Sequence, residues 1–316
     1  RCWRRSKRSL HRAEIEGARA MFKTDQAKGL VLTTLGALAI VPDSLFVRLI
    51  GAEALVVAFW RALFVGLGIT LVILVMRGPS AFRAVFGTGF YGALYTVCMS
   101  ASGLLFVLAV SLTSVANVVF IIASMPVFAA IFSRIILGEQ ISRRMVWTIL
   151  AVVPGLAIIA YGSGETKGAS VTGDLLALLV SAVYALGLTA ARKVRKVPMV
   201  PAVGLGYLAS AGGIMLFVDP FVVSHQQVSL SLAHAAFIGL SATFMALGPR
   251  YIPSAEVALL LLLESVLAPL LMWVAMGEVP GGWTLTGGAV VLGALALSNW
   301  SAMRASRRRP VGPLPH

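Results

Sequence analysis

Ten apolar segments, each close to the length of a membrane-spanning helix, constrain the fold of this chain more than any other feature. The segments lie at about residues 29–50, 54–76, 87–110, 114–136, 144–162, 173–191, 201–219, 231–250, 254–276 and 284–303. A helix of roughly 20 apolar residues crosses the hydrocarbon layer of a bilayer. Backbone polar groups in that layer must bond to one another, so the segments should be helical. The sequence therefore predicts an all-α integral membrane protein with ten transmembrane helices.

The composition excludes an ordinary soluble protein. Apolar residue types make up 59% of the chain, charged types make up 12%, and mean hydropathy is +0.92, whereas soluble proteins carry about 25% charged residues. Two cysteines, Cys2 and Cys98, are too few for a disulfide framework. The four histidines lack the spacing of metal ligands. We expect neither a metal site nor a cofactor.

The basic residues indicate a topology. A net charge of +14 could suggest nucleic acid, but Lys and Arg in a membrane protein more often set its orientation. With ten helices, the chain after residue 28 places 14 Lys and Arg on one side of the membrane, and only Arg48 and Lys167 on the other. Because basic residues concentrate on the cytoplasmic side, both termini should be cytoplasmic. The sequence predicts a multi-pass protein of a bacterial-type cytoplasmic (inner) membrane, with the lipid bilayer as partner and no nucleic-acid partner.

Both ends of the chain are polar and basic. Residues 1–28 form a predicted cytoplasmic arm, which is either an expression scar or mis-assigned start, or a segment that lies on anionic lipid. Residues 304–316 form a predicted cytoplasmic tail.

Two stretches far apart in the chain are similar to each other. The stretch "ASMPVFAAIFSRIILGE" (residues 123–139) aligns with "LLESVLAPLLMWVAMGE" (residues 262–278), and both end in Gly-Glu, as Gly138-Glu139 and Gly277-Glu278. This repeat divides the chain into two predicted five-helix halves, residues 29–162 and 173–303. Because five is odd, the second half should cross the membrane in the opposite direction. Inverted repeats of this kind are typical of transporters, whose sites lie near the midplane between the halves.

Three stretches resemble the drug/metabolite transporter superfamily, EamA type, over about residues 29–302. They are "FWRAL" (59–63), "TSVANVVFIIASMPVFAAIFSRIILGEQIS" (113–142) and "LESVLAPLLMWVAMGE" (263–278). The resemblance implies a secondary transporter, a permease that commonly exports small metabolites, amino acids or drug-like solutes. It implies no single substrate, because the family's substrates differ widely. The family usually has proline at the position of Ser265, whereas here a proline follows at Pro269, so a kink would be displaced.

Three charged residues inside predicted spans stand out, because charges there are costly and mark function by default. Asp43 and Arg61 each lie about seven residues from the same end of adjacent helices, or roughly 10 Å deep. They could form a polar gate, Arg61 could anchor an anionic solute group, or the two could form a structural ion pair. Glu264 lies near the middle of the ninth segment. It could bind and release a proton, hold an ammonium group of the solute, or hydrogen-bond to a neighbouring helix.

Other side chains are weaker candidates for the site. Trp60, Tyr95 and Tyr184 could line an aromatic cavity, or could anchor the chain at the interface and pack. Pro126 and Pro269 should interrupt the fourth and ninth helices, and the freed carbonyls would be tolerable only where they face protein or water.

Polar residues also mark predicted helix ends. Asn117 and its repeat equivalent Glu256 lie just inside helix starts, where an acceptor side chain can cap free N–H groups. Each Gly-Glu pair should end a helix, since glycine suits that position. We expect Glu139 to pair with Arg143 and Arg144 and the two pairs to lock helix four to five and nine to ten, with gating as the alternative.

Two other function classes are disfavoured. A membrane-embedded enzyme would need a nucleophile with a base, or metal ligands, and no H-E-x-x-H or G-x-S-x-G motif occurs. His225 and His234 fall in or near the loop before the predicted eighth helix. No stretch resembles the filter loop of a channel, although a channel-like facilitator stays an alternative. No Walker motif occurs, so the energy should come from an ion gradient, such as one of protons, or from the solute's own gradient. We therefore expect a transporter and no catalytic residues.

Overall fold

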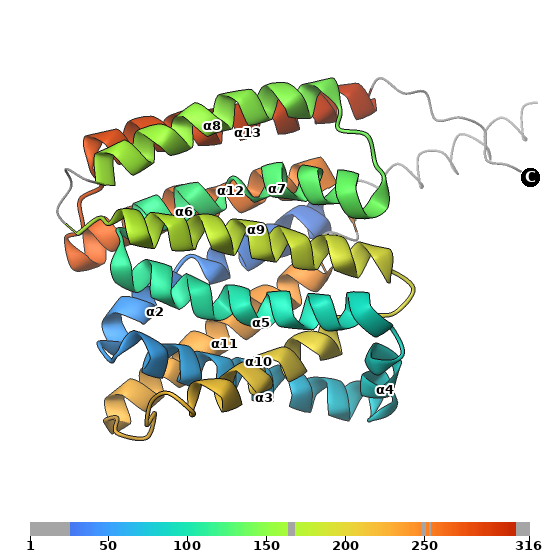
Figure 1. The fold of residues 1–316 in the computed structure, drawn as a ribbon, viewed down its shortest axis with the longest axis vertical. Coiled ribbons are helices and arrows are strands. Elements are labelled where there is room, and N and C mark those ends of the chain that lie inside the picture. Colours follow the sequence, from blue (N-terminus) through green and yellow to red (C-terminus); the bar gives the residue numbers. More distant parts are fainter. Residues whose placement is uncertain (1–25, 164–167, 248–250, 253, 308–316) are drawn as a thin grey trace, which may run out of the picture.

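The computed structural model describes residues 26–163, 168–247, 251–252 and 254–307, and the regular elements among them are all helices that run side by side (Figure 1). After a helix over residues 26–40, these are α2 (Asp43–Ile50), α3 (Ala54–Arg77), α4 (Ser80–Phe86), α5 (Gly89–Leu112), α6 (Val115–Ile122), α7 (Met125–Phe132), a π-helical turn η1 (Ser133–Leu137), α8 (Arg143–Ser163), α9 (Val171–Lys193), α10 (Val200–Ile214), α11 (His225–Leu247), α12 (Ser254–Met276) and α13 (Gly282–Arg307).

Eight stretches of the described residues are long and apolar enough to cross a membrane. They are Gln26–Ile50, Ala54–Arg77, Gly89–Leu112, Val115–Leu137, Arg143–Ser163, Val171–Lys193, His225–Met245 and Gly282–Arg304. The seventh and ninth predicted segments contain the shorter apolar helices Val200–Ile214 and Leu260–Met276. The chain is therefore an all-helical, multi-pass membrane protein in the part described, where eight of the ten predicted segments form stretches of this kind. In the seventh segment, α10 ends one residue after the Gly212-Gly213 pair, whose low helix propensity explains the early end.

The start of α11 corrects a predicted boundary. This helix begins at His225 rather than at residue 231. Ser224 and Gln227 cap it reciprocally: Gln227 N donates to Ser224 Oγ at 3.2 Å, and Ser224 N donates to Gln227 Oε1 at 2.9 Å. This capping box lies in the stretch that the sequence analysis reads as a loop. As a result, His234 lies well inside a helix and not in a linker.

The helices are not interrupted at the positions that the prolines predict. The fourth span is interrupted at residues 123–124, and Pro126 occupies the first turn of α7, where a missing N–H removes no helix bond. The first span has an unpredicted break at residues 41–42, so Asp43 is the first residue of α2. The expectation for Pro269 is wrong, because α12 continues through it. Neighbouring Ala268 and Met272 are buried, and such packing can hold a helix together across a proline in a membrane.

Two helix pairs show why small residues recur in the chain. Helix α8 packs along α13, and α3 packs along α10 (Figure 1). A Cβ added at Gly287 of α13 would lie 2.5 Å from the carbonyl oxygen of Gly155 in α8, and one added at Gly155 would lie 3.0 Å from that of Gly287. Glycine therefore permits the close backbone approach on which helix association in lipid depends.

This contact generates a stability prediction. Replacing Gly287 by Ala should force α8 and α13 apart and lower the free energy of unfolding by about 1–3 kcal/mol, the usual effect of overpacking. Thermal unfolding in detergent would measure the change. Gly293→Ala is the matched control, because nothing lies within 4 Å of a Cβ at that position of the same helix. Equal midpoints for the two variants would contradict the close contact.

Candidate functional site

A buried cluster of three charged or titratable side chains lies at the centre of the bundle. Arg61 of α3 donates from Nη2 to Asp43 Oδ2 at 3.1 Å, and His234 Nε2 of α11 lies 2.5 Å from Asp43 Oδ1. Asp43 and Arg61 are each 6% exposed and His234 is 0% exposed. The similar depth of Asp43 and Arg61 agrees with the sequence analysis. The third member, His234, was missed there because it was assigned to the region of the loop before the eighth helix, whereas it lies well inside α11.

The position of Asp43 suits a carboxylate. It begins α2, directly after Pro42, and the positive end of the helix dipole favours a negative charge in the first turn. Because an isolated charge this deep would cost several kcal/mol, it needs a paired cation, and Arg61 provides one. The ring of His234 stacks on Phe46 of the same short helix, with centroids 5.4 Å apart and planes 16° apart.

Aromatic rings surround the guanidinium of Arg61. It lies over Phe106 of α5 and Tyr207 of α10, at 5.6 and 5.9 Å from the ring centroids. Gly103 makes room for both groups, since a Cβ there would lie 2.7 Å from Tyr207 Cε1 and 3.0 Å from Arg61 Nη1. Tyr207 has no counterpart among the sequence-predicted candidates. A tyrosine among small residues in an apolar segment gives no distinguishing signal.

Three of the predicted residues approach this cluster. Glu264 of α12 lies near enough to Asp43 for their charges to interact, and Tyr184 of α9 interacts with Tyr207, Glu264 and Arg61. Tyr95 of α5 is buried and interacts with Tyr184 and Tyr207. The structure thus brings together side chains from α2, α3, α5, α9, α10, α11 and α12.

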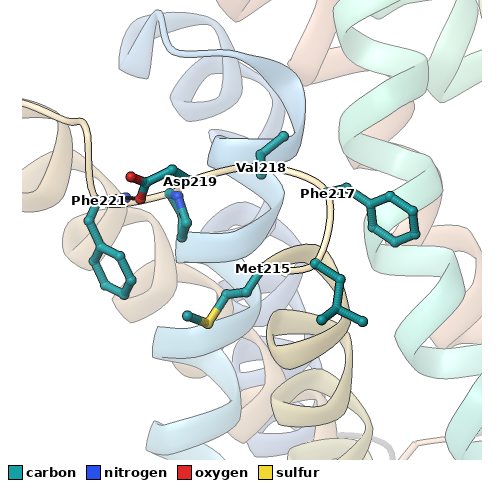
Figure 2. Close-up of a pocket in the computed structure, with 7 residues that line it drawn as sticks. Met215, Phe217, Val218, Asp219 and Phe221 are labelled. Atoms are coloured by element: carbon teal, nitrogen blue, oxygen red, sulfur yellow. Dashed lines mark hydrogen bonds between the residues drawn. The ribbon is translucent and has the colours of Figure 1, made fainter.

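Trp60 lies elsewhere. Its Nε1 donates to the carbonyl oxygen of Pro220 at 2.9 Å, and its ring contacts Phe64 and Phe221 edge-on or tilted. It therefore ties the connection between α10 and α11 to α3. That connection forms a shallow cavity of about 320 Å³ (Figure 2), lined by Met215, Leu216, Phe217, Val218, Asp219, Pro220 and Phe221.

This cavity carries little chemistry. Its lining comes from a single connection, and Figure 2 shows Phe217 and Phe221 pointing to opposite sides. Its one carboxylate, Asp219, accepts a hydrogen bond from its neighbour Phe221 N at 3.1 Å. The buried cluster around Arg61 is the stronger candidate, because it brings charged side chains together from several helices. None of those charged residues lines the cavity.

A second polar network joins helix ends around Asp174. Asn117 Nδ2 donates to Asp174 Oδ1 at 2.9 Å and to Ser163 Oγ at 2.7 Å, and Thr284 Oγ1 donates to Asn117 Oδ1 at 2.6 Å. Thr113 Oγ1 donates to Asp174 Oδ1 at 2.8 Å, and the Ser163 hydroxyl donates to Oδ2 of the same carboxylate. Asp174, 4% exposed, is held by neutral donors at the start of α9. Because every polar atom named here has a partner, the network is a structural junction between α5, α6, α8, α9 and α13.

The capping role expected for Asn117 is wrong. Ser114, three residues earlier, is the residue that caps α6, accepting from Asn117 N at 3.2 Å. The Asn117 side chain is then free to reach the neighbouring helices. Glu256 also has a different partner, since its Oε1 accepts from Gln26 Nε2 at 3.4 Å.

The two Gly-Glu elements end their helices and then pair with distant arginines. Gly138 and Gly277 have positive φ values of 72° and 68°, which glycine adopts without strain. Glu139 pairs with Arg192 at the end of α9, at 2.6 and 3.2 Å, and not with Arg143 or Arg144 as expected. The reason is that α9 ends beside η1, where Arg192 also donates to Ser133 Oγ at 3.1 Å.

Glu278 is held at the other end of the bundle. It accepts from Val115 N at 2.6 Å and lies 3.8 Å from Arg48, which in turn donates to Thr113 O at 2.9 Å. Glu278 therefore joins α12 to α2 and α6, which corrects the expected link between helices nine and ten. We call the two ion pairs, Glu139–Arg192 and Glu278–Arg48, the clasps.

The central cluster offers groups that can bind a small molecule. A guanidinium, a carboxyl group and phenols can bind ionic and aromatic groups of a small molecule. Among the described residues, no group of three or more His, Cys, Asp and Glu side chains could hold a metal ion.

Comparisons with known proteins agree with this architecture. No curated protein matches the chain. A solved structure described as "Crystal structure of protein" superposes on 88% of this chain and 99% of its own, with a TM-score of 0.60 and 18% identity, which is a likeness of fold. The profile of the EamA-like transporter family matches residues 27–161 and, a second time, residues 171–300. With most of its length covered by these two matches, and with the resemblance seen in the sequence thereby confirmed, the chain belongs to the EamA-like transporter family.

Proposed function

We propose that this chain is a secondary transporter that exports a small solute across a cytoplasmic membrane, with both termini in the cytoplasm. Ten helices would form two inverted halves, residues 29–162 and 173–303, that provide access to each side in turn. The observation that carries the proposal is the convergence of Asp43 and Arg61, from the first half, with His234 and Tyr207, from the second half. Transporters with inverted repeats bind their solute at such a junction.

The faces of α9 and α12 support an interior binding space. Tyr184 lies seven residues after the fully buried Ala177, which is about two helical turns and therefore the same face. The exposed Leu175 and Leu179 lie on the other face of α9, toward lipid. Tyr184 nevertheless keeps 39% of its surface accessible, as expected of a residue that borders a space between the halves.

Glu264 is suited to couple export to protons. It lies four residues before the buried Ala268, and so on the interior face of α12. A single carboxyl group can hold either a proton or an ammonium group of the solute. Because the two occupants exclude each other, entry of a proton from outside would release the solute there. This exclusion is the requirement for an exchange of solute for protons.

The clasps are suited to alternate during the cycle. Glu139 and Arg192 lie at one end of the bundle, and Glu278, the repeat equivalent of Glu139, lies with Arg48 at the other. Each clasp joins the first helix of one half to the fourth helix of the other half. Opening on one side would separate the clasp on that side while the other stays closed. We propose the Arg192 clasp as the cytoplasmic gate and the Arg48 clasp as the external gate.

Transport itself is the first test. Comparing the metabolites released by cells with and without the protein should identify the solute, and proteoliposomes should then transport it. A proton gradient should drive its accumulation, and a protonophore should abolish that accumulation. A protein that moves no solute under these conditions would contradict the function.

Glu264→Gln tests the coupling. The variant should lose uphill accumulation while retaining downhill flow, because an amide cannot exchange a proton. Accumulation ratios in proteoliposomes measure the effect, and Glu53→Gln, at an exposed carboxyl group at the start of α3, is the control. Normal uphill transport by Glu264→Gln would remove this residue from the coupling.

Breaking the clasps should shift the protein in opposite directions. A cysteine placed at residue 184, in a chain with Cys2 and Cys98 replaced by Ser, can be labelled from either side with an impermeant maleimide. Glu139→Gln with Arg192→Gln should raise cytoplasmic labelling about two- to fivefold, the effect of one partly exposed ion pair. Glu278→Gln with Arg48→Gln should raise external labelling instead. If both double variants raised labelling from the same side of the membrane, the assignment of the two gates would be wrong.

A further inference from the structure

His234 contacts one of the two carboxylate oxygens of Asp43, and Arg61 contacts the other. Asp43 Oδ1 faces His234 Nε2 at 2.5 Å, so only Oδ2 is left to Arg61. An ionised carboxylate is an acceptor only, so His234 must carry a proton on Nε2 and donate it. The imidazole is completely buried and stacked on Phe46. These contacts fix the direction of its N–H group.

Arg61 is consequently anchored but unsaturated. Arginine and carboxylate usually pair through two parallel hydrogen bonds, whereas here a single contact joins Arg61 Nη2 to Asp43. Arg61 Nε is buried and has no hydrogen-bond partner, although buried polar groups rarely lack one. Nη1 lies over Gly103 beside the phenol group of Tyr207, which can accept one of its N–H groups. The guanidinium has five N–H donors, and Nε–H at least is left for another acceptor.

We propose that His234 is a positioning residue that keeps Asp43 from closing over Arg61, so that Arg61 binds a carboxylate group of the transported solute. The planar fork of guanidinium matches a carboxylate. A phosphate dianion fits less well. Among the described residues of this cluster, Arg61 is the only arginine or lysine in an ion pair, and the carboxyl groups of Asp43 and Glu264 nearby would repel a second negative charge. The site would then accept one negative charge.

This inference deepens the proposed function, since it names the chemical group that Arg61 recognises. It gives Asp43 a part as well: the carboxylate stabilises the buried arginine without saturating it. Removal of the His234 donor would free Asp43 Oδ1, which would rotate to form the bidentate pair and occupy the donors reserved for the solute.

Acetate binding to the purified protein in lipid nanodiscs tests the proposal directly. Acetate should raise the thermal unfolding midpoint beyond the effect of sodium chloride at equal ionic strength, and phosphate should bind more weakly. His234→Leu should weaken acetate at least about tenfold, the effect of losing one hydrogen bond to a charged group. His234→Gln, which keeps an N–H donor, should restore acetate affinity to within about threefold. In transport, His234→Leu should raise KM for the solute and leave the maximal rate nearly unchanged.

Further variants keep the test decisive if His234→Leu does not fold. Gly103→Ala leaves the His234–Asp43 contact in place, but its Cβ would lie 3.0 Å from Arg61 Nη1 and should also weaken acetate. Arg61→Lys keeps the charge and loses the fork, so acetate should bind more weakly there too. The exposed Glu53→Gln is the control and should bind acetate as the unaltered protein does.

Three results would overturn the proposal: acetate without effect on the unaltered protein, unchanged acetate affinity in His234→Leu or Gly103→Ala, or phosphate binding more tightly than acetate. These failures are separable from failure of the proposed function. A protein that transports a solute but ignores acetate refutes only the carboxylate site. A protein that binds acetate through Arg61 and transports nothing refutes only the transporter.

Discussion

The centre of this protein depends on the two polar contacts that the Asp43 carboxylate makes. This carboxylate joins α2 to α3 through Arg61 and to α11 through His234, and in doing so it holds a cation that could not otherwise stay buried. Phe106 and Tyr207 then pack against the guanidinium from α5 and α10. Helices of both halves therefore meet at one ion pair.

The ends of the helices follow a different rule from the centre. There, unpaired backbone groups and charged side chains meet, and the chain uses them to join helices that are distant in sequence. Glu278 accepts from Val115 N and pairs with Arg48, while Asp174 is held by neutral donors from three other helices. The centre thus has an arginine with unused donors, whereas the Asp174 junction is saturated. Unsaturated donors favour binding, and saturated networks favour stability.

Much of this arrangement follows from simple counting along the chain. Asp43 and Arg61 are equally distant from the same end of adjacent helices, so the sequence predicts their encounter. Counting likewise places Glu264 near the middle of its segment. The failures come from local signals that were read too broadly. The Ser224–Gln227 capping box lengthens α11 and brings His234 into the core, and Ser114 rather than Asn117 caps α6. Pro269 was expected to break α12, but packing on both sides of it preserves the helix.

The sequence by itself determined that the chain is a multi-pass helical membrane protein, because hydropathy and segment length depend only on local composition, and its motifs carried the resemblance to the family that the profile match shows. It also predicted the burial of Asp43 and Arg61, since depth follows from position in a segment. Only the tertiary structure decided the partners. Glu139 pairs with Arg192, 53 residues away, rather than with the arginines next to it, and His234 pairs with Asp43 across 191 residues. The physical reason is that a side chain in a helix bundle bonds to whichever helix packs beside it, and packing depends on the shape of every helix surface together.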